Sequence, residues 1–375
     1  MRPAHVLWNL LGLGVPLIIA VLAIPALLGL IGAERFGFLA LAWGLIGYAS
    51  ALDLGIGRAT NQRVSALRSN AGDHQIPDVI ATAIRITLGT GVAGMSLIIM
   101  ATLSGAQTLV AADTVPADEI KISMLLLALA LPLQAVSATY RGINEAYLNF
   151  KGINYLRMFF GITNFGAPYL ISIFAKEMYW LIAALVLSSL VVLLSYRHLA
   201  HQCLKNAKLN KRGIYVKAHA HMLLKFGGWF SISSVVGPLM VYADRFFIGG
   251  LISAAAVTFY VIPYEVAIQM LIFTGAVTTV IFPFLTNLLQ KAPKQANVVF
   301  RLWLYRISGM MAVIMTLLAY AMPKLLESWV GDHIAGDSVR VGQILCLGVF
   351  INAVGTMFFS ICTHMDRPNR QQFCI

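Results

Sequence analysis

The chain has 375 residues, of which 59% are hydrophobic and 11% are charged, and its mean hydropathy is +0.80. A soluble domain is about a quarter charged, so this chain has too few polar side chains to cover a surface in water. Its long apolar runs lack the alternation of outer-membrane strands. They therefore predict an all-α, multi-pass membrane protein.

Ten apolar segments are long enough to cross a hydrocarbon core of about 30 Å as helices. We expect them to form a polytopic bundle of ten spans. In chain order the predicted spans are Val6–Leu30, Phe36–Gly57, Val79–Leu103, Ile122–Tyr140, Met158–Ala175, Met178–Tyr196, Phe226–Ile248, Val261–Leu285, Leu302–Ala321 and Val341–Cys362.

Lysine and arginine are distributed very unequally between alternate loops. With the N-terminus in the cytoplasm, 20 of the 27 basic residues fall inside and 5 outside, and the remaining two lie within spans. Cytoplasmic loops carry such an excess of positive charge. The sequence therefore predicts a cytoplasmic N-terminus, a cytoplasmic 197–225 loop and a cytoplasmic C-terminus. This topology accounts for the net charge of +12 without a nucleic-acid partner.

The 197–225 loop is rich in basic residues and has no acidic residue. It is predicted to lie at the anionic inner leaflet or to act as a solvated linker. Its histidines have no second set of ligands, so we predict no metal site there. The loop divides the chain into a six-helix bundle (1–200), a linker (201–225) and an incomplete four-helix bundle (226–375). Similar surroundings of Pro16 and Pro238 favour a parallel internal repeat.

Ionisable side chains inside a membrane are costly and face protein or water rather than lipid. By their depth in the predicted spans, Asp53 and Arg85 belong near the cytoplasmic mouth of a cavity. Asp244, Arg245 and Glu265 belong near its outer mouth. These charged side chains are also candidates for ion pairs that hold the helices together: Asp53 with Arg58, and Arg245 with Glu265. Neighbouring helical residues project about 100° apart, which separates Asp244 from Arg245. The candidate site residues are Asp53, Arg58, Arg85, Asp244, Arg245 and Glu265.

Two stretches resemble polysaccharide-biosynthesis flippases of the O-antigen (Wzx-type) group. They are "ERFGFLALAWGLIGYASALDLGIGRATNQRVS" (34–65) and "VYADRFFIGGLISAAAVTFYVIPYEVA" (241–267). The resemblance implies membership of the multidrug/oligosaccharidyl-lipid/polysaccharide flippase superfamily, with two bundles around a central cavity. It implies transfer of an undecaprenyl-pyrophosphate-linked oligosaccharide across the cytoplasmic (inner) membrane by alternating access, without a cofactor. Membrane lipids and the polysaccharide polymerase or ligase machinery are the other expected partners.

The chain departs from the family in ending soon after the tenth predicted span, where the family usually has twelve or more. The sequence therefore leaves open that it is an inactive truncated fragment. A multidrug or cation antiporter of the same architecture is the other alternative. We do not expect an enzyme, because the outer loops carry no catalytic constellation for sugar chemistry. The "LGIG" motif (54–57) lacks the Lys-Ser/Thr of a phosphate-binding loop and favours close helix packing instead.

Overall fold

The structure is a computed structural model that describes residues 3–49, 53–70, 72–105, 112, 114–209 and 213–364. This described part is α-helical and contains no strand, which confirms the predicted fold class. The helices are α1 (Pro3–Ala49), α2 (Ile56–Ser69), α3 (Ile76–Leu103), α4 (Ala117–Ala128), α5 (Ala130–Ala146), α6 (Phe150–Ser172), α7 (Met178–Asn206), α8 (Lys217–Leu251), α9 (Ala254–Gln269), α10 (Leu271–Lys291), α11 (Pro293–Val330) and α12 (Asp332–His364).

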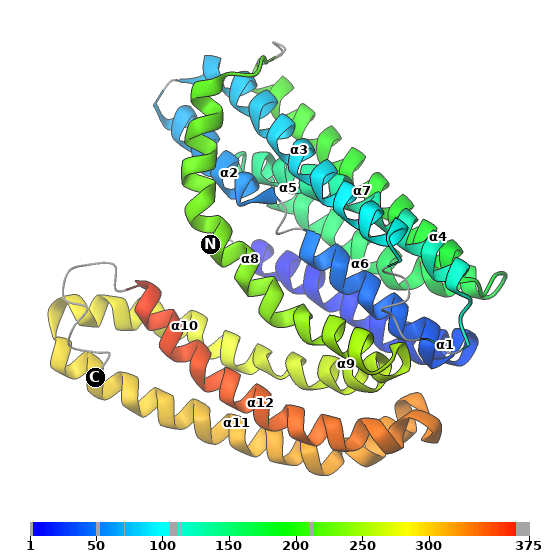
Figure 1. The fold of residues 1–375 in the computed structure, drawn as a ribbon. Coiled ribbons are helices and arrows are strands. Elements are labelled where there is room, and N and C mark those ends of the chain that lie inside the picture. Colours follow the sequence, from blue (N-terminus) through cyan, green and yellow to red (C-terminus); the bar gives the residue numbers. More distant parts are fainter. Residues whose placement is uncertain are drawn as a thin grey trace. The chain divides into compact units, whose positions relative to one another are not determined.

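Each of the ten predicted spans falls on a helix of this set. The first two share α1, whose helical geometry is interrupted at Gly32 (φ 78°, ψ 171°), a conformation that glycine adopts without a Cβ clash. Figure 1 draws α1 as two arms that meet at this break. The fourth predicted span covers α4 and α5, and the eighth covers α9 and α10. By length and apolar composition alone, seven segments of the described residues qualify as membrane spans.

One predicted boundary is wrong. The second span was expected to continue to Gly57, but its helix ends at Ala49, and a separate helix, α2, begins at Ile56. The intervening Leu54 and Gly55 have positive φ angles of 49° and 69°, which a continuous right-handed helix does not allow. The α2 helix is largely polar and presents one buried face, with Ile56, Val64 and Leu67, to its neighbours.

The helices group into two compact units, Met1–Thr258 and Phe259–Ile375. In the first unit, α2, α3, α5, α6 and α7 enclose a core that includes Ile56, Val79, Ile143, Ile153 and Val192. In the second unit, α12 packs on α11 and α10, and its Gly342 lies close to Pro263 of α9 and Met322 of α11. The predicted division into bundles at 201–225 stays a prediction. Pro238 lies outside the residues whose side chains are described, so the repeat also stays a prediction.

Two prolines inside helices leave carbonyl groups that a neighbouring helix satisfies. Proline has no N–H to donate to the carbonyl four residues earlier. In α6, Pro168 leaves the carbonyl of Asn164 free, and the indole N–H of Trp43 on α1 donates to it at 3.2 Å. In α11, Pro323 leaves the carbonyl of Ala319 free, and the amide of Gln343 on α12 donates to it at 3.2 Å. A lipid environment offers no water for such groups, so these bonds fix which helices pack together.

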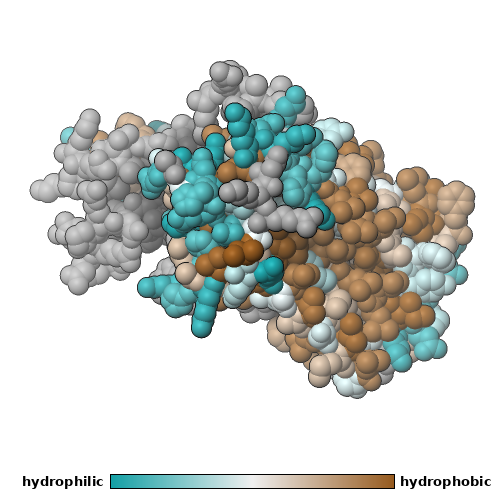
Figure 2. All heavy atoms as spheres, turned by 90° about the horizontal axis from the view of Figure 1, so that it is seen from above, coloured by the Kyte–Doolittle hydropathy of each residue, from teal (hydrophilic) through white to brown (hydrophobic). Residues whose placement is uncertain are grey.

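Figure 2 shows hydrophilic side chains gathered over one part of the face it presents, beside a broad hydrophobic area. Large apolar side chains are exposed along the helices of the first unit, among them Leu97 and Met100 on α3 and Leu187 on α7. An exposed surface of this kind is unfavourable in water and favourable in lipid. The side-chain distribution agrees with a multi-pass membrane protein.

Candidate functional site

Asp53 lies in the turn between α1 and α2, and its side chain is buried. Its carboxylate accepts hydrogen bonds from the backbone N–H groups of Gly55 at 2.8 Å and Gly57 at 3.1 Å. Burial raises the pKa of Asp53, and these two hydrogen bonds oppose the rise. The carboxylate therefore organises the start of α2. Asp53 was expected late in the second span, but it lies in the turn between two helices. Its expected partner, Arg58, has an exposed side chain.

One glycine on each helix, Gly57 on α2 and Gly142 on α5, allows the two helices to touch. A Cβ on Gly142 of α5 would lie 2.1 Å from the carbonyl oxygen of Gly57, and a Cβ on Gly57 would lie 2.7 Å from the carbonyl oxygen of Ala138. Real Cβ atoms do not approach backbone oxygen so closely. The "LGIG" motif is therefore a helix-packing motif, as the sequence indicated.

Arg85 lies on the third turn of α3, and its side chain is exposed. Its guanidinium carbon is 5.9 Å from the ring centroid of Tyr215, a residue of the extended segment before α8. The same segment is fixed to α3 by two backbone N–H groups. Ile214 donates to the carboxylate of Asp78 at 2.8 Å, and Val216 donates to the hydroxyl of Thr82 at 3.0 Å. This part of the predicted 197–225 loop is thus packed on α3 next to Arg85.

Asp244 and Arg245 lie late in α8, in the first unit. The Asp244 carboxylate accepts the backbone N–H of Arg245 at 2.8 Å, while the Arg245 side chain is buried and its guanidinium carbon is 5.2 Å from the ring centroid of Tyr242. Tyr242 in turn packs on Gly44 and Gly47 of α1. Glu265 belongs to the second unit, and its pairing with Arg245 stays a prediction.

Sequence reasoning missed a charged cluster that joins three connections of the first unit. Arg35, just after the break in α1, forms two hydrogen bonds with the carboxylate of Glu119 at the start of α4, at 2.9 and 3.0 Å. The same carboxylate accepts the first backbone N–H of α7, from Met178, at 2.6 Å. Glu119 is buried. The available signal was an acidic residue in the first turn of a helix, which interacts favourably with a helix N-terminus.

These contacts show which connections share an end of the first unit. Arg35, Glu119 and Met178 come from the three connections that the charge count assigned to the outside. At the other end, the Arg68 side chain donates to the carbonyl of Ala146 and stacks over the Tyr147 ring, 4.2 Å from its centroid. These contacts agree with the predicted alternation of loops within the first unit. Which end faces the cytoplasm stays a prediction.

The histidines of the 197–225 region lie in different surroundings. His198 is exposed and lies 2.8 Å from the amide nitrogen of Gln202. His219 is partly buried in the first turn of α8, and burial, with the nearby Arg63, lowers its pKa while Asp78 raises it. Within the part of the chain that the structure describes, no three His, Cys, Asp or Glu residues are grouped so that they could hold a metal ion.

The chain resembles proteins of known families over most of its length. Residues 4–289 match the model of the family described as polysaccharide biosynthesis protein. A protein of Shigella flexneri named "Putative O-antigen transporter" is 26% identical over 353 residues, which cover 94% of this chain and 82% of that protein.

Solved structures of multidrug transporters share the fold. An inward-facing multidrug resistance MATE family transporter of the MOP superfamily matches with a TM-score of 0.72 at 12% identity, covering 95% of this chain and 84% of that one. The bent form of the Vibrio cholerae MATE transporter VcmN matches with a TM-score of 0.60 at 16% identity, covering 96% of this chain and 80% of that one. At such identities the likeness concerns the fold alone.

Proposed function

The chain belongs to the polysaccharide biosynthesis protein family, and we propose that it moves a lipid-linked oligosaccharide between the leaflets of the cytoplasmic membrane. It is a membrane protein of the polysaccharide or O-antigen transporter type. The observation that carries the proposal is the match to an O-antigen transporter-type relative along 94% of the chain, on a fold of membrane-crossing helices.

The substrate class follows from the chemistry that such a family requires. An oligosaccharide cannot cross a hydrocarbon core unaided, because its hydroxyl groups would lose their hydrogen bonds to water. A protein that buries polar groups inside a membrane bundle supplies a route, and alternating access opens that route to one side at a time. The likeness to multidrug transporters rests on the fold alone and adds no support for the antiporter alternative.

Arg85 is the proposed contact for the pyrophosphate of the lipid carrier. Its exposed guanidinium is presented from α3 beside Tyr215, at the end of the first unit that the charge count assigns to the cytoplasm. An arginine guanidinium donates two parallel hydrogen bonds to phosphate oxygens, whereas a lysine ammonium acts as a point charge. Arginine therefore suits a pyrophosphate better than lysine does. Asp53, Arg58, Asp244, Arg245 and Glu265 remain candidate residues of the transport route.

Genetic complementation tests the proposal. The full chain is expressed in a bacterial strain that lacks its own O-antigen flippase but makes the glycan that this chain transports. We expect surface glycan to reappear, with the chain present in the inner membrane. A chain that is present and folded in the membrane, yet restores no surface glycan with any of a panel of repeat-unit structures, contradicts the proposal.

A further inference from the structure

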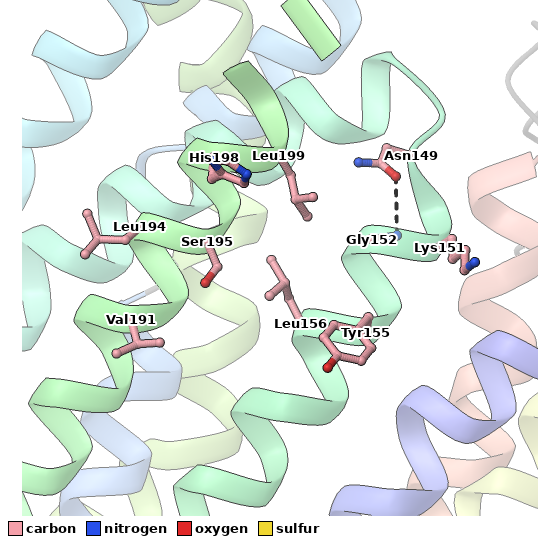
Figure 3. Close-up of a pocket in the computed structure, with 10 residues that line it drawn as sticks. All are labelled: Asn149, Lys151, Gly152, Tyr155, Leu156, Val191, Leu194, Ser195, His198 and Leu199. Atoms are coloured by element: carbon pink, nitrogen blue, oxygen red, sulfur yellow. Dashed lines mark hydrogen bonds between the residues drawn. The ribbon is translucent and has the colours of Figure 1, made fainter. Parts of the chain in front are cut away.

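A groove of about 620 Å³ opens on the first unit between α6 and α7 (Figure 3). Its volume is within the usual range of small-molecule sites, roughly 300–1,000 Å³. Figure 3 shows Leu156, Ser195 and Leu199 between the two helices. Its lining residues include Lys151, Leu156, Val191, Leu194 and His198.

The groove is polar at one end and apolar along its walls. Lys151 lies at the start of α6 and His198 in the last third of α7, and both line the groove at the same end because the two helices run in opposite directions. Away from this end the exposed side chains are apolar. On α7 they include Leu194 (50% exposed), Val191 and Leu187, which lie on one helical face. The groove thus continues into a surface suited to lipid chains.

The polar end of the groove is held in place by local bonds. Asn149 caps α6 by accepting the backbone N–H of Gly152 at 3.3 Å. The absence of a Cβ at Gly152 lets Leu199 approach, since a Cβ there would lie 2.9 Å from its methyl group. His198 is held by Gln202 at 2.8 Å. A site whose walls are fixed in advance binds without the entropy cost of ordering them.

The surroundings of the polar end are positively charged. The first two turns of α6, residues 150–157, contain Lys151 and Arg157 and no acidic residue. Residues 197–208 at the end of α7 contain Arg197, Lys205 and Lys208 and also no acidic residue. Lys151 is the one lysine or arginine among the residues that line the described groove. This charge favours an anionic lipid headgroup over a zwitterionic one.

We propose that the groove between α6 and α7 binds one anionic phospholipid of the bilayer. Its phosphate lies at the polar end of the groove, which Lys151 and His198 line, and an acyl chain follows Leu156, Val191 and Leu194 along the walls. This site is separate from the proposed transport of a lipid-linked oligosaccharide and does not depend on it. Each basic residue near a membrane surface strengthens the binding of anionic lipid about fivefold.

Native mass spectrometry of the full chain tests the proposal. The purified protein is stripped of lipid in detergent and titrated with phosphatidylglycerol or with phosphatidylcholine of the same acyl chains. We expect one tightly bound phosphatidylglycerol and about fivefold weaker binding to Lys151→Gln. The matched control is Lys176→Gln, which removes the same charge at an exposed position in the connection between α6 and α7, outside the groove, and it should bind as the wild type does.

A second pair of variants tests the walls without changing charge. Leu194→Trp fills the groove and should abolish the tight binding. Leu97→Trp makes the same change on α3, at a side chain that is 68% exposed and does not line the groove, and should leave binding intact. Both positions are exposed, so both variants should fold.

Three results would overturn the proposal. The first is equal binding of phosphatidylglycerol and phosphatidylcholine. The second is unchanged binding to both Lys151→Gln and Leu194→Trp. The third is displacement of phosphatidylglycerol by an equimolar polyprenyl diphosphate, which would assign the groove to the transported lipid.

Discussion

At the residue scale, the charged side chains of the first unit have distinct structural roles. Asp53 holds the start of α2 through two amide hydrogen bonds, and Glu119 joins Arg35 to the start of α7. Arg85 is exposed on α3. Two of these groups therefore stabilise the fold, whereas the third is free of a structural ion pair among the contacts described and is the better candidate for binding substrate.

Glu119→Gln should lower the free energy of unfolding by about 2 kcal/mol, because hydrogen bonds to a charged group contribute about 1.5–3 kcal/mol. The change keeps the shape of the side chain but removes its charge next to Arg35. The control is Glu145→Gln, which breaks the more exposed pair with Arg141 (3.7 Å) and should cost under about 0.5 kcal/mol. Equilibrium unfolding in mixed detergent measures both. Equal losses of unfolding free energy in the two variants would show that the Arg35–Glu119 cluster stabilises the fold no more than an exposed ion pair does.

Arg85→Ala should leave the amount of protein in the membrane unchanged and lower surface glycan at least tenfold in the complementation strain, because one bidentate phosphate contact is lost. Arg85→Lys should restore part of this activity, since lysine supplies charge without the paired geometry. Leu88→Ala, at an exposed position on the next turn of α3, is the control and should behave as the wild type. Full activity of both arginine variants would remove Arg85 from the proposed site.

At the element scale, apolar length located the helices well, but not their breaks. All ten predicted spans fall on helices because about 20 apolar residues are what a bilayer selects. The end of the second span was misplaced because "LDLGIG" remains apolar, while the backbone turns through the positive φ angles of Leu54 and Gly55. Contacts between distant residues, such as Arg35 with Glu119, depend on which helices are neighbours. Span counting does not supply that information.

Trp43→Phe should lower the free energy of unfolding by about 1–2 kcal/mol. The aromatic ring is kept, but the indole N–H is lost, and the Asn164 carbonyl freed by Pro168 then has no donor in a medium without water. Trp180→Phe makes the same change at a side chain that is 51% exposed and should have little effect. The comparison uses unfolding in the same mixed detergent. A Trp43 variant as stable as the Trp180 variant would contradict the proposed role of the proline-freed carbonyl.

At the scale of the whole molecule, the sequence predicts that successive loops alternate between the two sides of the membrane. It also predicts which set of loops faces the cytoplasm. The contacts within the first unit agree with the predicted alternation. The predicted orientation rests on the 20 basic residues counted inside against 5 outside. A reporter active only in the periplasm should work when fused after residue 110 and fail when fused after residue 210. The opposite pattern would reverse the orientation.

The fold at this scale does not decide the substrate. The matched multidrug transporters share the arrangement of helices at 12–16% identity, so the same architecture serves proteins with other cargoes. Membership of the polysaccharide biosynthesis family is what favours a glycan. The decisive test must therefore follow the glycan itself across a membrane.

That measurement is transport by the purified full chain in lipid vesicles. A fluorescent undecaprenyl-pyrophosphate oligosaccharide is placed in both leaflets, and a membrane-impermeant reductant quenches whatever reaches the outer leaflet. We predict that vesicles containing the chain lose nearly all fluorescence, whereas protein-free vesicles and vesicles with the Arg85→Ala variant keep about half during the assay. Folded chain that leaves the inner-leaflet half protected, with every oligosaccharide tried, would contradict the assignment of this protein as a carrier of lipid-linked glycan.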